Sequence, residues 1–230
     1  MTSTLAVIPA RAGSKRLPNK NLLPFLGKPL IWWTVDFAIG VGGFDLVMVT
    51  TDSPEIADIA RNAGAYVPWL RPSELASDTA TSIDVVIHAA DNVNSKRNSF
   101  DRVALLQPTS PIRLSERWVQ ASEYLDQGAP AAIGVHDASW HPYWMYFMGE
   151  QEVLYPCFPN DMTTRSQDLP RAYVPNGALY LTGIESLRTH RTFSPAGTRG
   201  VVCTERVESI DIDTAEDWSE AELRCREYLK

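Results

Sequence analysis

The run Leu5-Ala6-Val7-Ile8-Pro9-Ala10-Arg11-Ala12-Gly13-Ser14-Lys15-Arg16-Leu17-Pro18-Asn19-Lys20-Asn21 decides how the rest of the chain is interpreted. Its first four residues are apolar and predict a short buried strand, which Pro9 ends. A basic loop follows, because five cations lie between Arg11 and Lys28 and no acidic residue appears before Asp36. The run therefore predicts a strand that delivers a positively charged loop.

Strand and helix patterns alternate on the C-terminal side of this run. Strands are expected over 5–8, 44–50, 103–106, 131–135 and 176–181. Helices are expected over 30–39, 52–64, 79–94, 114–126 and 214–229. This order predicts an α/β protein with a doubly wound, mostly parallel sheet and helices on both of its faces. Ligands of such sheets bind at the carboxyl ends of the strands, so the residues just after Ile8, Val49 and Leu106 matter most.

Composition and charge exclude several classes of protein. The 230 residues support one sizeable core, and the net charge of -7 argues against a general nucleic-acid binder. No apolar run is long enough to span a bilayer, and the N-terminus does not resemble a signal peptide. The three cysteines form no CxxC pair, which indicates free thiols and no zinc site. We therefore expect a cytoplasmic protein with no membrane or nucleic-acid partner.

The loop after the first strand suits a triphosphate. Gly13-Ser14 allows backbone N–H groups to approach a ligand closely, and the arginines and lysines around it can grip phosphate oxygens. The loop contains neither GxxxxGK[ST] nor GxGxxG, so the pattern indicates neither a P-loop ATPase nor a dinucleotide-dependent dehydrogenase. The alternative is an ordinary solvated basic loop.

The run from Pro9 to Asn21 closely resembles the opening signature of the acylneuraminate cytidylyltransferases, also called CMP-sialic acid synthetases. The resemblance recurs in order over essentially the whole chain, at 27–30, 70–79, 105–111, 176–180 and 211–213. Lys15 and the pair Lys20-Asn21 favour the sialate branch over the related CMP-KDO synthetases. The resemblance implies one Rossmann-like cytidylyltransferase domain over 1–230, of the nucleotide-diphospho-sugar transferase type.

The resemblance also implies an activity, in which CMP passes from CTP to the anomeric 2-hydroxyl of a sialic acid and pyrophosphate leaves. The residues implied for the nucleotide are Arg11, Lys15, Lys20, Asn21, Arg71, Ala80 and Ser82. Those implied for the sugar acid are Gln107, Arg165, Gln167, Tyr180 and Phe193. Lys20, Arg11 and Asp211 would be catalytic, with Mg²⁺ held by Asp211 and Asp213.

Several of these positions have a plainer interpretation. Asp52 and Asp78 each precede an expected helix, so we interpret both as helix caps rather than ligands. Ser82 falls inside an expected helix, where an exposed serine is ordinary. None of the four histidines forms a spacing motif, so no side chain is a persuasive general base.

The run Ile210-Asp211-Ile212-Asp213 alternates in the manner of a strand, which would point both carboxylates to one side. Two carboxylates on one side repel each other unless a cation neutralises them. Hard oxygen ligands combined with substrate phosphates are typical of Mg²⁺. For Asp213 the alternative is a cap of the helix that begins at Thr214.

The alternating pattern breaks over 139–173, where aromatic residues and prolines are common and helix signals are few. In the family that the chain resembles, this inserted segment packs against a second subunit and helps to build its sugar site. That implies a homodimer with Trp140 and Phe147 among its contacts, and it brings Arg165 to the partner's pocket. The alternative is a satellite core within one chain.

Three rival functions remain open at this point. The same chemistry on a legionaminic, pseudaminic or KDO-type acid has the same motifs. A catalytically inactive nucleotide-binding module would be expected to lack Asp211 or the Lys20-Asn21 pair, and both are present. A sugar-1-phosphate nucleotidyltransferase would normally show a glycine-rich loop ending in Thr-Arg-Leu, where this chain has Ser-Lys-Arg-Leu.

Overall fold

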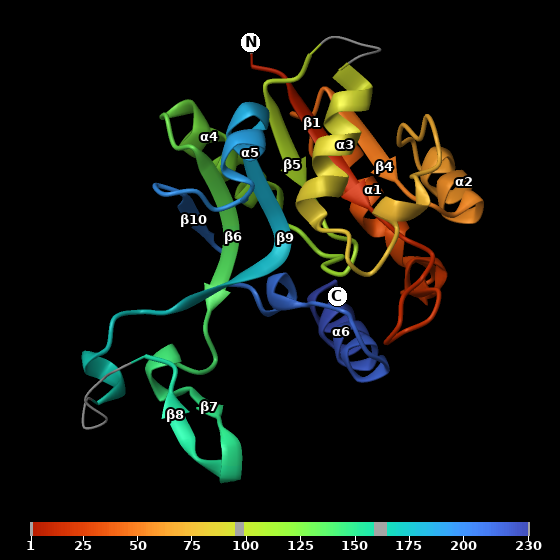
Figure 1. Cartoon of the computed structure of the whole chain (residues 1–230). Coiled ribbons are helices and arrows are strands. Elements are labelled where there is room, and N and C mark those ends of the chain that lie inside the picture. Colours follow the sequence, from red (N-terminus) through yellow and green to blue (C-terminus); the bar gives the residue numbers. More distant parts are fainter. Residues whose placement is uncertain (1, 95–98, 159–164, 230) are drawn as a thin grey trace.

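A computed structural model describes residues 2–94, 99–158 and 165–229, and a six-stranded sheet lies at its centre (Figure 1). Its strands are β1 (Thr4–Pro9), β4 (Leu46–Thr50), β5 (Arg102–Leu105), β6 (Ala131–Asp137), β9 (Tyr173–Gly183) and β10 (Arg199–Val202). Their spatial order is β10-β6-β9-β5-β1-β4, and only β9 runs antiparallel to its neighbours. The mostly parallel sheet is therefore confirmed, and its parallel strands end at one common edge.

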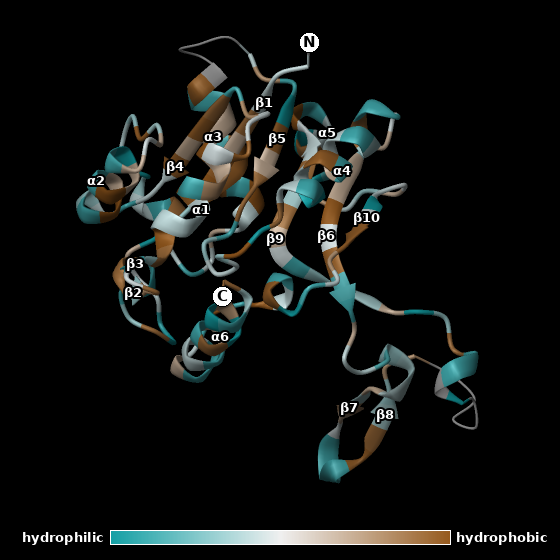
Figure 2. Ribbon diagram, turned by 180° about the vertical axis from the view of Figure 1, so that it is seen from behind, coloured by the Kyte–Doolittle hydropathy of each residue, from teal (hydrophilic) through white to brown (hydrophobic). Residues whose placement is uncertain are grey.

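Helices cover both faces of the sheet, which confirms the doubly wound α/β class. These helices are α1 (Leu30–Gly40), α2 (Pro54–Asn62), α3 (Ser82–Asn94), α4 (Ser115–Asp126) and α5 (Ile184–His190), and a further helix, α6 (Ala215–Tyr228), follows near the C-terminus. Helices α1, α2 and α4 share one hydrophobic core with the strands, and α3 and α5 share the core on the other face. Figure 2 shows the hydrophobic stretches that run along the strands between these layers.

Helix α6 lies beyond the carboxyl edge of the sheet rather than on either face (Figure 1). It closes a third, smaller core in which Ile210 and Ile212 pack against Phe25 and Leu30. This core includes residues next to the hairpin formed by β2 (Pro24–Phe25) and β3 (Lys28–Pro29). The C-terminal segment is thereby held against the loop that follows β1.

The helix caps differ from the sequence-based interpretation. Helix α3 begins at Ser82 rather than Thr79, and the Thr81 hydroxyl accepts the Asp84 N–H at 3.1 Å, so Asp78 is not its cap. Ser53 caps α2 in place of Asp52, because its hydroxyl accepts the Ile56 N–H at 3.2 Å. In each helix a short hydroxyl side chain accepts an N–H of the first turn that has no partner within the helix. The carboxylates of Asp52 and Asp78 are therefore available for other contacts.

The expected strand over 210–213 is not part of any sheet. Burial nevertheless alternates as predicted, since Ile210 and Ile212 are buried while Asp211 is exposed and Asp213 is half-buried. Thr214, not Asp213, caps α6 through its hydroxyl. The sequence also did not predict β10 or α5, because both are short and surrounded by loop residues.

The segment from Ser139 onward projects away from the sheet, and its core is the hairpin of β7 (Tyr146–Met148) and β8 (Leu154–Pro156) (Figure 1). Short 3-10 helices flank the hairpin, namely η3 (Pro142–Trp144), η4 (Glu150–Glu152) and η5 (Ser166–Asp168). Its large side chains are exposed, with Trp140 at 73% and Phe147 at 66%. A satellite core within one chain is therefore not what the described part of this segment forms.

Among the described residues, no helix combines the length and the apolar character needed to cross a membrane. All three cysteines are free thiols, as predicted.

Candidate active site

The loop after β1 turns back under the sheet and buries Lys20. Asn19 adopts a left-handed conformation, with φ of 55°, and opens the short 3-10 helix η1 (Lys20–Leu22). The Lys20 ammonium donates to the carbonyl oxygen of Ile212 at 2.6 Å and to Asp213 Oδ1 at 2.8 Å. Segments almost two hundred residues apart in sequence therefore meet at one lysine.

The other cations of the loop are also paired with carboxylates. Arg11 and Lys15 both contact Asp78, at 2.8 and 2.6 Å, and Arg16 pairs with Asp213. Hydrogen bonds from Lys15 and Arg11 lower the pKa of the Asp78 carboxyl below its usual value. Two acids from distant parts of the chain thus neutralise four cations of the loop.

A cavity of about 240 Å³ opens at the carboxyl ends of β1 and β5, beside the N-terminus of α3. Five residues expected at the site line it together, although they lie far apart in the sequence: Arg11, Arg71, Ala80, Ser82 and Gln107. The remaining lining residues include Pro9, Asp78 and Thr109. The edge of the sheet that the strand order singled out is therefore the edge that holds the cavity.

Arg71 is the cation in this cavity whose charge is poorly met. Its side chain is buried, and its Nε and Nη2 have no hydrogen-bond partner among the described residues. Asp52 is the nearest carboxylate, with 3.9 Å between Arg71 Nη2 and Asp52 Oδ1. Burial lowers the pKa of Arg71 below its usual value. Unpaired buried donors of this kind are expected to meet a ligand.

Two of the side chains expected around the sugar acid, Tyr180 and Phe193, lie on the α3 and α5 side of the sheet. Tyr180 on β9 packs against Phe193 with ring centroids 5.5 Å apart. Burial and the nearby Asp211 carboxylate raise the pKa of the Tyr180 hydroxyl. Gln107 approaches β9 closely, because a Cβ added to Gly177 would lie 2.8 Å from Gln107 Oε1. Gly177 also has a φ of +73°. Glycine therefore suits this position for two reasons, the close approach of Gln107 and the positive φ.

Asp211 and Asp213 differ in their surroundings. Asp213 is already held by two cations, whereas Asp211 has no hydrogen bond or ion pair with any residue that the structure describes. Asp211 lines a cavity of about 180 Å³ together with Asp217 and Glu220. Within the described ranges no three His, Cys, Asp or Glu side chains gather as a complete metal site. A cation at Asp211 would have to take its other ligands from a substrate or from water.

Two of the expected sugar-site residues lie elsewhere. Arg165 and Gln167 are on the projecting segment near η5, where both are exposed and Arg165 pairs with Asp168 at 3.2 Å. Neither lines the cavity of its own chain. Lys15 is at the rim of the site, with 75% of its side chain exposed.

The sequence interpretation missed the roles of two acids. Asp52 Oδ1 accepts the Ala12 N–H at 2.9 Å, which anchors the basic loop to the end of β4. Asp78 pairs with the loop as described above. Both were interpreted as caps because an acid before a helix is the usual capping pattern, and no local signal reveals a partner at a distant position.

The sequence profile of a family described as Cytidylyltransferase matches residues 5–144. The chain is 38% identical to the CMP-N,N'-diacetyllegionaminic acid synthase of Legionella pneumophila, over 94% of this chain and 93% of that protein. It is 33% identical to the N-acylneuraminate cytidylyltransferase of Streptococcus agalactiae, over 93% of this chain and 51% of that longer protein.

The fold also matches a solved structure. A CMP:2-keto-3-deoxy-manno-octonic acid synthetase in complex with CTP superimposes with a TM-score of 0.72, over 99% of this chain and all of the other. The sequence identity is 19%, so this likeness shows the shared fold alone.

Proposed function

The chain belongs to the cytidylyltransferase family and, within it, to the enzymes that transfer CMP onto a nonulosonic acid; from this premise we propose how its residues perform the reaction. CTP enters the cavity of about 240 Å³ with its base toward Arg71 and its phosphates toward the basic loop. The anomeric hydroxyl of the acid attacks the α-phosphate, and pyrophosphate leaves.

The unpartnered guanidinium of Arg71 carries this proposal. Its Nε and Nη2 are buried donors that find no acceptor in the described part of the chain, and the edge of a cytosine offers a carbonyl oxygen and a ring nitrogen that accept. A buried cation that gains acceptors only when the ligand binds supplies binding energy and selects against ligands that lack them. Ala80 and Ser82, at the start of α3, line the same cavity and would face the base and ribose.

The basic loop would hold the triphosphate. Arg11 and Lys15 would exchange Asp78 for phosphate oxygens, and Lys20 would stabilise charge on the α-phosphate and on the leaving pyrophosphate. Asn21, which is buried and donates to the Arg11 carbonyl oxygen at 3.2 Å, would support the loop from behind. Positioning and charge stabilisation account for most of the catalysis of such transfers.

The donor set at Asp211 fits a magnesium ion. Mg²⁺ commonly takes one or two carboxylates and completes its shell with water and substrate phosphates, and Asp211 offers a free, exposed carboxylate. Asp213 fits only as a second ligand, after Lys20 and Arg16 have released it. A bound Mg²⁺ would neutralise charge on the phosphate oxygens.

The sugar acid would lie between Gln107 and the Tyr180–Phe193 pair, near Asp211. Arg165 and Gln167 would reach this site from a second copy of the chain. The exposed aromatic residues of the projecting segment support such a homodimer, because apolar patches of this kind usually mark an interface.

We infer an acceptor of the legionaminic type, because a relative with that activity in its name is 38% identical along nearly the whole of both chains. Sialic acid, which the motifs favoured, is the second candidate, and a relative named for N-acylneuraminate supports it. The two acids differ in the number of N-acetyl groups that the pocket must accept. The name N,N'-diacetyllegionaminic acid specifies two such groups.

Pyrophosphate release tests both levels of the proposal. The enzyme is incubated with CTP and one acid at a time from a panel of N,N'-diacetyllegionaminic, pseudaminic, N-acetylneuraminic and KDO acids, with and without Mg²⁺. We expect the highest kcat/KM with the legionaminic acid and no release without metal. A higher kcat/KM with sialic acid would reverse the choice of acceptor, and no release with any acid would overturn the proposed reaction.

A further inference from the structure

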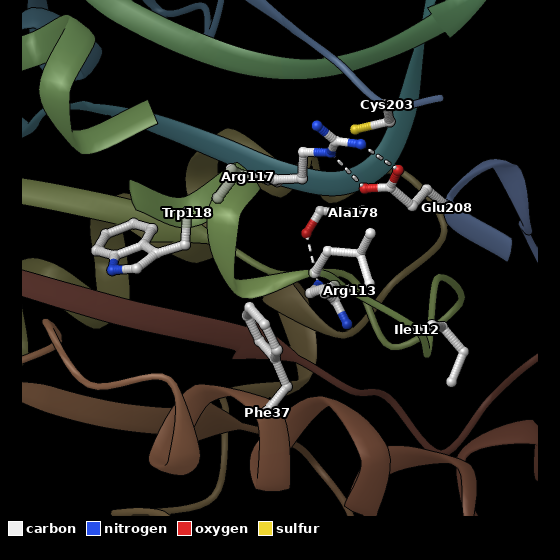
Figure 3. A pocket seen from close by; sticks show the side chains of 10 residues that line it. Phe37, Ile112, Arg113, Arg117, Trp118, Ala178, Cys203 and Glu208 are labelled. Carbon is white, nitrogen blue, oxygen red and sulfur yellow. Dashed lines mark hydrogen bonds and ion pairs between the residues drawn. The ribbon is translucent and has the colours of Figure 1, made fainter. Parts of the chain in front are cut away.

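An ion pair between the half-buried Arg117 and the buried Glu208 joins α4 to the turn just before Asp211. Arg117 Nε and Nη2 donate to the two carboxylate oxygens of Glu208 at 2.9 and 3.0 Å, as the dashed lines in Figure 3 show. Glu208 is only 2% exposed and lies in the 3-10 helix η6 (Arg206–Ser209). It also accepts the Glu205 N–H at 3.1 Å, which closes the first turn of η6.

The surroundings of this pair are largely apolar. It borders a cavity of about 20 Å³ that is also lined by Phe37, Ile112 and Trp118 (Figure 3). Burial, and next the negative Glu208, raise the pKa of the Cys203 thiol to about 12. A two-point ion pair in such surroundings is strong and has a defined geometry, because each oxygen has its own donor.

Glu208 is connected to the site through a chain of hydrogen bonds. Its carbonyl oxygen accepts from Asn176 Nδ2 at 3.0 Å, and the Asn176 carbonyl oxygen accepts from Ser110 Oγ at 2.9 Å. Four residues beyond Glu208, the Ile212 N–H donates to the Thr109 carbonyl oxygen at 2.8 Å. The turn η6 is thereby tied to β9 and to the loop that carries Gln107.

The segment 210–213 is held by side-chain contacts and by the turn that precedes it. It belongs to no sheet, so no ladder of backbone hydrogen bonds determines where Asp211 and Asp213 lie. On its C-terminal side, Lys20 binds the Ile212 carbonyl oxygen and Asp213, and the Asp213 N–H donates to Asp217 Oδ2 at 3.0 Å. The Ile212 N–H and the two buried isoleucines anchor its middle, and the turn η6 is the anchor that directly precedes Asp211. Loss of the Arg117–Glu208 pair would leave Arg117 without its carboxylate and η6 without its bond to α4.

We propose that Glu208, through its ion pair with Arg117, is a positioning residue that holds Asp211 and Asp213 at their working distance from the basic loop. It contacts no substrate, and it acts on the carboxylates through the backbone of the turn. This inference rests on the proposed function, because it assumes that these carboxylates serve the metal and the phosphates.

The substitution Glu208→Gln tests the proposal, because glutamine keeps the shape and removes the charge. Outer-shell partners of metal ligands typically contribute ten- to a hundredfold in metal affinity or activity. We expect the Mn²⁺ dissociation constant, measured by electron paramagnetic resonance with CTP present, to rise about tenfold, and kcat to fall about tenfold. The dissociation constant of CTP without metal should change less than about twofold, since Arg71 lies away from η6.

Asp126→Asn is the matched control. It breaks an ion pair of similar length, 2.8 Å to Arg102, at the amino end of β5 and far from the site. We expect a lower melting temperature at most, with wild-type kcat and Mn²⁺ affinity. Equal losses in both variants would show a general stability effect and would overturn the proposal, as would wild-type kcat and Mn²⁺ affinity in folded Glu208→Gln.

Arg117→Lys is the second variant that tests the positioning role, and it is used if Glu208→Gln does not fold. Lysine keeps the positive charge and loses the two-point geometry, so a smaller rise in the Mn²⁺ dissociation constant is expected, and no rise overturns the proposal. Absence of pyrophosphate release by the wild type would refute the proposed function. The Mn²⁺ measurement needs only metal and CTP and is independent of that result.

Discussion

Lys20 and Arg71 are both buried cations, and they differ in what meets their charge. Lys20 has a carbonyl oxygen and a carboxylate within 2.8 Å, so it is satisfied within the protein. Arg71 has two nitrogens without acceptors and a carboxylate only at 3.9 Å. A buried donor without a partner costs about 1–3 kcal/mol. Arg71 therefore reduces the stability of the free protein, which is expected of a residue retained for binding.

Replacing Arg71 by methionine should separate stability from function. The change removes a buried cation whose one ion pair among the described residues is long, 3.9 Å to Asp52, and keeps most of the side-chain volume. We expect the melting temperature to stay level or to rise by a few degrees, while the CTP dissociation constant rises at least tenfold. Calorimetry and thermal unfolding measure the two effects. A variant that binds CTP normally would contradict the role of Arg71 at the base.

Lys20→Ala should abolish most turnover with little loss of fold. Removal of one preorganised charge at a transferring phosphoryl group costs on the order of a hundredfold in kcat. Pyrophosphate release measures the loss and circular dichroism checks the fold. Lys28→Ala is the control, because Lys28 is an exposed lysine on the nearby strand β3 whose ammonium lies over the Trp32 ring. A Lys20→Ala enzyme with near wild-type kcat would remove Lys20 from the mechanism.

At the scale of elements, the basic loop between β1 and α1 is held by acids from three other places. Asp52 holds its backbone, Asp78 pairs with Arg11 and Lys15, and Asp213 pairs with Lys20 and Arg16. Under the proposed function, phosphate oxygens would replace Asp78 and Asp213 at these cations, while Asp52 would keep its bond to the loop backbone. The free protein thus keeps its cations together without a ligand, and an incoming triphosphate must replace the carboxylates.

Asp78→Asn should therefore tighten CTP binding. The amide no longer competes for Arg11 and Lys15, so we expect the CTP dissociation constant, measured without metal at low salt, to fall about threefold to tenfold. The gain should shrink as salt rises, because exposed charges are screened. Asp58→Asn is the control, since it changes the net charge equally and breaks an exposed pair with Arg61 on α2. Weaker binding in Asp78→Asn would mean that Asp78 chiefly orders the loop.

At the scale of the whole molecule, the projecting segment is the part whose described large side chains are not buried by their own chain. Its aromatic side chains are exposed, and Arg165 and Gln167 lie on it, away from their own chain's cavity. The two observations have one explanation if each segment lies against a second copy and completes that copy's site. The symmetry of a two-fold dimer then makes both sites equivalent.

Mixing two inactive variants tests this shared site. Lys20→Ala damages a site from within, and Arg165→Ala damages the site of the partner. In a mixed dimer both defects fall on one site and leave the other intact, so random reassortment should restore about a quarter of wild-type activity. Co-expression followed by pyrophosphate release measures the rescue, and light scattering measures the mass. No rescue from mixed dimers would place Arg165 outside the partner's site.

Much of the fold could be predicted from local pattern. Five of the sheet strands and five of the helices follow from runs of apolar residues, because such runs must be buried whatever the rest of the chain does. The position of the candidate site could also be predicted, because parallel strands place the loops that follow them at one edge of the sheet. Elements with a weak local signal were missed, namely β10, α5 and the short hairpins β2–β3 and β7–β8.

The pairing of individual side chains could not be predicted in the same way. Asp52 and Asp78 look like helix caps in sequence, yet hydroxyl groups cap both helices and the acids contact the basic loop. The strand expected over 210–213 is an unpaired extended segment. The contacts of Asp52 and Asp78 depend on loop residues 40 and 67 positions away, which no local pattern reveals.

The sequence alone determined the layered α/β architecture, the basic loop after the first strand and the family, because these depend on order and composition along the chain. Only the tertiary structure decided that Lys20 meets Asp213, that Arg71 lacks acceptors and that Glu208 joins Arg117. Such contacts form where elements pack, and electrostatic energies change steeply over a few ångströms that no local pattern encodes.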